Sequence, residues 1–258
     1  MKIATVGKGG SGKTTIAGTL ARILAMQKQK VLAIEGDPNP NLALTLGIPR
    51  EKTSEINFIP HTIMKIEEDD ETGEKILRMT ISEKELFKKY ATKAPDDIDL
   101  IVMGHPIDGT AGSGWMCASH RAVRGLIVEL TSFRKHTITD MEAGLEHLKR
   151  GTAKNVEMML IVVEPYYRSL EAGMRTYRLA KELGITHLFA VSNKTRNLAD
   201  KNAIESFCEK HSMEIIGDIP YDENLIESER NGVAPIDFNF DAPSILEISK
   251  IASWISKN

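Results

Sequence analysis

The chain has 258 residues, a length that fits one α/β domain with a large buried core. It carries 33 Lys and Arg against 36 Asp and Glu, a net charge of -3, which argues against a surface that coats nucleic acid. The N-terminus runs directly into a predicted strand without a charged and apolar leader, and no stretch is apolar enough to span a bilayer. We therefore expect a cytoplasmic protein, with neither nucleic acid nor membrane among its partners.

Short runs of β-branched and other apolar residues alternate with longer segments of helical period. Several runs are apolar almost throughout, which is typical of parallel strands that helices cover on both faces. The predicted strands are Ile3–Val6, Val31–Ile34, Leu100–Met103, Thr137–Thr139, Met158–Val163, Leu188–Val191 and Glu214–Ile219. This alternation predicts an α/β fold, with a doubly wound, mostly parallel sheet and helices on both faces.

Apolar residues spaced three and four apart predict helices over residues 13–27, 119–133, 169–184 and 198–211, the third ending at a capping glycine, Gly184. The amphipathic C-terminal segment is predicted to pack on the core rather than on a membrane. Residues 62–81 hold two alternating runs around Asp-Glu-Thr-Gly, which predicts an inserted β-hairpin. Because repeats and linkers are lacking, residues 1–258 are predicted to form a single domain.

A phosphate-binding loop follows the first predicted strand and opens the first predicted helix. The sequence Gly7-Lys8-Gly9-Gly10-Ser11-Gly12-Lys13-Thr14-Thr15 contains the full pattern G-x-x-x-x-G-K-T. Its glycines let successive N–H groups face an anion, and the helix N-terminus adds its positive dipole end. We expect Lys13 to reach the β- and γ-phosphates of ATP, Thr14 to bind Mg²⁺ and Thr15 to contact the α-phosphate.

Two acidic residues follow predicted strands beside this loop. Asp37, in "EGDPNPN", is placed to orient the attacking water, and Asn39 and Asn41 in the same turn are placed to sense the γ-phosphate. The alternative is that Asp-Pro-Asn-Pro is only a good turn sequence. Asp140 ends a later strand and is expected to hold Mg²⁺ through a water, while Gly144 offers its N–H to the γ-phosphate.

The nucleobase is expected over the carboxyl ends of the last strands, where ligands bind in open α/β sheets. Asn193 can both donate to and accept from a purine edge. The turn Pro220-Tyr221-Asp222 is a second candidate contact to the base. The alternative, for Asn193 and for this turn, is that the residues only form loops between the strands and helices.

Three stretches resemble a known class of ATPases. "KGGSGKTT" with Lys8, "DPNPN" with Asp37 and "DMEAGLEHLKRGT" with Asp140 are similar to the deviant Walker A ATPases, which include MinD, ParA and the nitrogenase iron protein. Within this class the chain most resembles the CooC-type carbon monoxide dehydrogenase accessory ATPases, in "LAIEGDPNPNLALTLGI" and "VVEPYYRSLEAG". The resemblance implies a homodimer driven by ATP, slow hydrolysis, and nickel insertion into a client metalloenzyme, with carbon monoxide dehydrogenase the best candidate.

The class resemblance also gives Lys8 a role, that of the signature lysine which reaches the phosphates bound by the partner subunit. Two phosphate sites that meet face to face concentrate negative charge, and a cation supplied in trans relieves it. A lysine that is merely solvated in its loop is the alternative.

The region around Cys117 leaves a transition-metal site open. CooC-type proteins share a Cys-x-Cys pair here, whereas this chain has Trp115 in place of the first cysteine. Cys117 and His120 from two subunits would form a four-ligand site for Ni²⁺ or Zn²⁺. Alternatively, one Cys117 from each subunit holds an ion transiently, or no metal binds and Trp115 fills an apolar interface. Without a metal, the runner-up function is a MinD/ParA-type positioning switch.

Overall fold

The computed structural model describes residues 1–37, 41–68, 75–103, 125, 130, 136–142 and 156–257. Its main sheet has nine strands, and all neighbouring pairs except one are parallel. In spatial order the strands are β11 (Glu214–Pro220), β10 (His187–Thr195), β9 (Met158–Val163), β1 (Lys2–Gly7), β8 (His136–Asp140), β2 (Val31–Glu35), β7 (Ile98–Met103) and β3 (Phe58–Ile59), with β6 (Thr92–Ala94) antiparallel to β7. The predicted mostly parallel α/β sheet is confirmed.

Successive residues of the central strands point into two separate hydrophobic clusters, one on each face of the sheet. Along β9, for example, Leu160 faces one cluster and Ile161 the other, and neither is exposed. This two-sided burial explains why the strands read as nearly continuous apolar runs.

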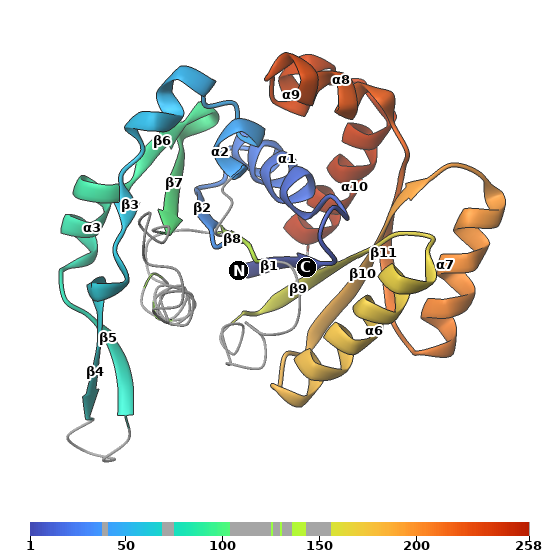
Figure 1. Cartoon of the computed structure of the whole chain (residues 1–258), viewed down its shortest axis with the longest axis horizontal. Coiled ribbons are helices and arrows are strands. Elements are labelled where there is room, and N and C mark those ends of the chain that lie inside the picture. Colours follow the sequence, from blue (N-terminus) through green and yellow to red (C-terminus); the bar gives the residue numbers. More distant parts are fainter. Residues whose placement is uncertain are drawn as a thin grey trace, which may run out of the picture.

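Helices cover both faces of the sheet, as Figure 1 shows. One face carries α1 (Lys13–Met26), α2 (Leu42–Thr45), α8 (Glu223–Asn231), α9 (Pro235–Phe238) and α10 (Pro243–Lys257). The other carries α3 (Glu83–Tyr90), α6 (Tyr167–Glu182) and α7 (Leu198–Lys210). Short 3₁₀ turns lie at Arg50–Glu55, His61–Ile63 and Pro95–Asp97.

The C-terminal helix α10 packs on the core, as predicted. Its apolar stripe of Ile245, Ile248, Ile251, Ala252 and Ile255 is at most 1% exposed. Among the described helices, none is long and apolar enough to cross a membrane.

The predicted hairpin is present as a separate two-stranded antiparallel sheet of β4 (Met64–Glu68) and β5 (Lys75–Met79). It extends away from the main sheet at the lower left of Figure 1. The acidic turn between its strands lies outside the described residues, as does most of the helix predicted over 119–133.

Several elements were not predicted. Helix α3 begins at a capping box in which Ser82 accepts from the N–H of Glu85 and Glu85 accepts from the N–H of Ser82. Strand β10 is longer than predicted and runs to Thr195, so that Asn193 lies within a strand rather than in a loop. The edge strands β3 and β6 are too short for their periodicity to be recognised.

Candidate functional site

The phosphate loop joins β1 to α1 and adopts the conformation that its glycines permit. Gly10 and Gly12 have φ values of 79° and 94°, in the left-handed region that side chains disfavour. The N–H of Ser11 donates to the carbonyl of Lys8 at 3.1 Å, which closes a turn with Gly9 and Gly10 at its tip.

Asn193, at the carboxyl end of β10, contacts this loop from the side. Its Nδ2 donates to the carbonyl of Ser11 at 2.7 Å, and the side chain is buried. A Cβ added to Gly12 would lie 2.5 Å from the same Nδ2. The bond to Ser11 fixes the orientation of the amide, because only its nitrogen can donate to a carbonyl.

Lys13, Thr14 and Asp140 meet at the start of α1. The Oγ1 of Thr14 donates to Oδ2 of Asp140 at 2.5 Å, and the Oγ1 of Thr5 donates to Oδ1 at 3.1 Å. Asp140 is fully buried at the end of β8, and burial raises its pKa to about 6, although the Thr14 bond and the Lys13 charge oppose this shift.

A hydroxyl and a carboxylate on the phosphate side of a P-loop are a suitable donor set for Mg²⁺. Magnesium prefers oxygen ligands, keeps several waters, and is held by one or two protein groups together with phosphates. The hydrogen bond between Thr14 and Asp140 shows that these two oxygens already lie together. The residues present therefore fit the predicted magnesium site.

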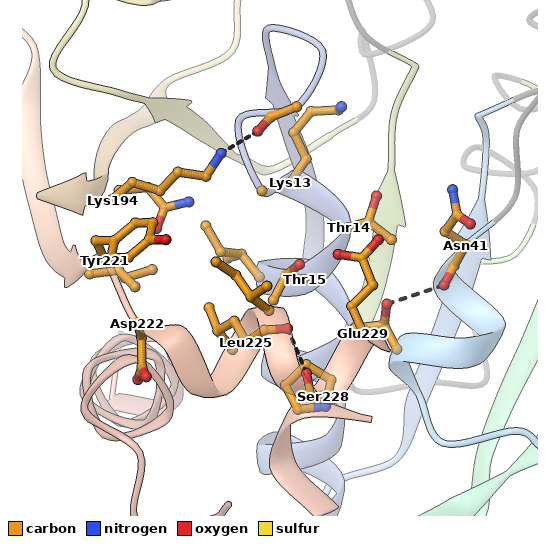
Figure 2. Close-up of a pocket in the computed structure, with 18 of the residues that line it drawn as sticks. Lys13, Thr14, Thr15, Asn41, Lys194, Tyr221, Asp222, Leu225, Ser228 and Glu229 are labelled. Atoms are coloured by element: carbon orange, nitrogen blue, oxygen red, sulfur yellow. Dashed lines mark hydrogen bonds between the residues drawn. The ribbon is translucent and has the colours of Figure 1, made fainter. Parts of the chain in front are cut away.

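A cavity of about 840 Å³ opens beside the loop and contains most of the predicted contacts. Figure 2 shows Lys13, Thr14 and Thr15 on one side of it, with Lys194 and Tyr221 on the other. Its lining includes these predicted residues: Gly9, Gly10, Gly12, Lys13, Thr14, Thr15, Asp37, Asn41, Asn193, Pro220, Tyr221 and Asp222. The fold thus brings strand ends far apart in sequence around one concave site.

Similarity to known proteins assigns the chain to a family. A model of the CobQ/CobB/MinD/ParA nucleotide binding domain matches residues 2–236. The chain belongs to this family. The cavity beside the phosphate loop is accordingly the candidate nucleotide site.

Relatives of the chain match nearly all of its length. An uncharacterized ATP-binding protein of Methanocaldococcus jannaschii is 38% identical, over 100% of this chain and 98% of that protein. The carbon monoxide dehydrogenase accessory protein CooC of Rhodospirillum rubrum is 34% identical, over 93% of this chain and 90% of that protein. The septum site-determining protein MinD of Pyrococcus horikoshii, solved with Mg-ADP, shares the fold at a TM-score of 0.74 and 19% identity, over 99% and 96% of the two chains.

Glu35, which supports the segment carrying Asp37, is a residue that sequence reasoning missed. It ends β2 and is fully buried, and its carboxylate accepts from the backbone N–H groups of Asp37, Asn41 and Leu42 at 3.1, 2.9 and 2.9 Å. Burial and the charge of Asp140 raise its pKa to about 8, against the effect of these donors. The acid that ends a buried strand two residues before Asp37 was the available signal.

The part of the cavity where the nucleobase is expected contains contacts that were not predicted. Arg196, which was not predicted, lies over the ring of Tyr221 at 4.4 Å from its centroid. The carboxylate of Asp222 accepts instead from the backbone of Asn224 and from the N–H and hydroxyl of Ser244. Asp222 therefore lines the cavity but uses its oxygens to cap α8 and to hold the start of α10.

Lys8 lies at the tip of the phosphate loop and is exposed. In the part of the chain that the structure describes, its ammonium group has no hydrogen-bond or ion-pair partner. Other predicted residues, namely Asn39, Trp115, Cys117, His120 and Gly144, lie outside the described residues. Cys208 is buried in the core, and burial raises the pKa of its thiol to about 11.

Proposed function

We propose that this protein hydrolyses ATP and that ATP joins two copies through Lys8. The observation that carries the proposal is the contrast between the two lysines of the loop. Lys13 is buried at 6% exposure beside Asp140, whereas Lys8 is exposed and without a partner among the described residues. A second cation of the loop that has no hydrogen-bond or ion-pair partner among the described residues of its own subunit is available to a phosphate site on another copy.

The chain's own residues divide the work of hydrolysis. Lys13 and the loop N–H groups hold the phosphates, and Lys13 balances charge that develops on the γ-phosphate during attack by water. Asp37 lines the cavity and orients that water, while Glu35 holds the backbone of the segment that carries Asp37. Thr14 and Asp140 would hold Mg²⁺, which would supply positive charge to neutralise the phosphates.

Asn193 favours adenine as the base. One N–H of its amide is used by Ser11, which leaves the other N–H and the Oδ1 oxygen for a ligand. This pair matches the acceptor N7 and the donor amine of adenine, whereas guanine presents two acceptors on that edge. The matched relative described as ATP-binding supports the same choice.

We further propose that the ATPase serves as a maturation factor that delivers nickel to a carbon monoxide dehydrogenase-type enzyme. The similarity to the CooC accessory protein over 93% of the chain supports this role. Nickel would be cargo, gathered by Cys117 with or without His120 at the interface of two subunits. A MinD/ParA-type positioning switch without metal is the second candidate, since MinD shares the fold.

Metal content separates the two candidates. We would measure Ni²⁺ and Zn²⁺ per dimer with ADP and with a non-hydrolysable ATP analogue. The wild type and Cys117→Ala would be compared, with Cys208→Ala as the control because that thiol is only 1% exposed. The maturation role requires an ion that Cys117→Ala loses and Cys208→Ala keeps. An ion that binds equally to all three proteins, or to none, contradicts it and favours the positioning switch.

A further inference from the structure

The residue next to Asn193 also contacts the phosphate loop. The Nζ of Lys194 donates to the carbonyl of Gly10 at 2.5 Å and forms an ion pair with Oε1 of Glu164 at 2.9 Å. Glu164 follows β9 and is buried at 7% exposure, so its charge is neutralised within the protein by Lys194. The three residues Glu164, Lys194 and Gly10 form a bridge from the sheet to the loop.

The backbone of β10 is distorted at Lys194. The pairing of β10 with β11 shifts register between Asn193 and Thr195, which leaves Lys194 as the extra residue of a bulge. Lys194 has a φ of 61°, which is costly for a residue with a side chain. Bulges re-aim side chains and concentrate beside active sites, and this one directs Lys194 to the loop. Figure 2 shows its extended side chain reaching the loop near Lys13.

The acceptor Gly10 belongs to the turn that presents Lys8. This turn is closed by the bond from the N–H of Ser11 to the carbonyl of Lys8, with Gly9 and Gly10 between them. Gly10 has a φ of 79° and would meet nothing within 4 Å if it had a Cβ, so packing does little to hold it in place. Asn193 holds the neighbouring carbonyl of Ser11, on the side of the loop that leads to Gly12 and Lys13.

We propose that Lys194 and Glu164 are positioning residues for Lys8. They fix the turn of residues 8–11 so that Lys8 projects from the subunit toward a second copy, while Asn193 fixes the part of the loop that binds the subunit's own phosphates. The inference rests on the proposed action of Lys8 in trans. It predicts that loss of the bridge impairs joining of two copies and turnover more than it impairs binding of a nucleotide to one subunit.

The test uses Lys194→Met, which keeps most of the side chain but not the donor. Analytical ultracentrifugation with a non-hydrolysable ATP analogue would measure the affinity of dimerisation. This affinity and kcat should each fall about tenfold, because a hydrogen bond from a charged donor is lost. The dissociation constant for MgADP should change by less than about twofold. Lys194→Arg, which can still donate, should restore part of both properties.

Two further variants exclude indirect effects. Lys194→Met leaves Glu164 buried without its partner, and the double variant Lys194→Met/Glu164→Gln removes that charge. If the double variant regains wild-type dimerisation, the contact to Gly10 is unimportant and the proposal is wrong. Lys201→Met is the matched control, because Lys201 on α7 pairs with Asp218 of β11 at 3.5 Å and forms no hydrogen bond or ion pair with the loop in the described part of the chain.

The outcomes also distinguish this inference from the proposed function. If Lys8→Ala abolishes dimerisation while Lys194→Met dimerises like the wild type, Lys8 acts in trans without help from the bridge, and only the positioning role fails. If Lys8→Ala dimerises and hydrolyses normally, the proposed function fails first. Equal losses of dimerisation and MgADP affinity in Lys194→Met would mean that the bridge supports the whole loop, which also contradicts the inference.

Discussion

Single residues decide the shape of the phosphate loop, and their effects can be separated by paired substitutions. Gly10 and Gly12 are both left-handed, so a Cβ at either position costs backbone strain. They differ in their surroundings, because a Cβ on Gly12 would lie 2.5 Å from Nδ2 of Asn193 and one on Gly10 would meet nothing within 4 Å. A side chain at either position would strain the backbone, but only a side chain at Gly12 would also clash with Asn193.

Gly12→Ala is therefore expected to abolish measurable nucleotide binding, whereas Gly10→Ala should weaken it by about tenfold, the cost of a residue with a side chain in a left-handed conformation. Binding of a fluorescent ATP analogue to each variant measures the difference. The double variant Gly12→Ala/Asn193→Ala removes the clashing group and should recover part of the lost binding. Equal affinities for the two single variants would contradict the importance of the Asn193 contact.

At the scale of elements, the sequence predicts best those features whose cause is local. The strands, the phosphate loop with α1, and the stripe of isoleucines on α10 follow from periodicity and glycine placement within one stretch of chain. Lys194 was missed because its loop partner, the carbonyl of Gly10, is brought near only by the fold. Glu35 was missed although its backbone partners lie within seven residues, because its part in the site is to hold the segment that carries Asp37. The contact of Asp222 with a base stays a prediction, and the bond that Ser244, 22 residues away, donates to one of its oxygens could not be predicted from local sequence.

The junction of α8 and α10 at Asp222 gives a stability prediction. Burial opposes ionisation of Asp222, but the hydrogen bonds from Asn224 and Ser244 outweigh it and lower its pKa below the usual value. A carboxyl group with a lowered folded-state pKa stabilises the fold above its unfolded pKa, and the contribution disappears as pH falls through the folded value. Asp222→Ala should therefore cost about 2 kcal/mol at pH 7, by loss of an N-cap and of bonds to a charged acceptor.

Thermal unfolding of the wild type and Asp222→Ala at several pH values checks this expectation. The Tm of the variant should lie roughly 5 °C lower between pH 5 and 8. The difference should begin to narrow below about pH 4, the unfolded-state pKa, and disappear as the pH falls through the lowered folded-state pKa. Glu223→Ala is the control, since Glu223 is exposed in the first turn of the same helix. A difference that is the same at pH 3.5 and pH 7 would show that the charge of Asp222 contributes nothing.

At the scale of the whole molecule, the carboxyl ends of the parallel strands form one edge where the nucleotide cavity lies. Residues from the ends of β1, β2, β9, β10 and β11 line it together with α1 and α8. Lys8 stands on the same edge and is exposed, so a second copy that approaches this edge would bring its own phosphates to Lys8. One surface would then serve both for nucleotide binding and for association, which would let ATP control the joining of two copies.

Mixing two inactive variants tests whether Lys8 acts on its own subunit or on its partner. Lys8→Ala keeps Lys13 and should bind ATP without hydrolysing it, whereas Lys13→Ala keeps Lys8 but loses the lysine that holds the phosphates. If Lys8 acts in trans, a mixed dimer contains one complete site, formed by ATP on the Lys8→Ala subunit and Lys8 from its partner.

The mixture of the two variants should then regain a substantial fraction of wild-type phosphate release, and this activity should rise with the concentration of Lys13→Ala. Lys30→Ala, at the amino-terminal edge of the sheet, keeps both lysines of the loop and should by itself hydrolyse ATP like the wild type. A mixture of Lys8→Ala and Lys13→Ala that stays as inactive as its components would place Lys8 in its own subunit's site and remove the physical reason for an ATP-driven dimer.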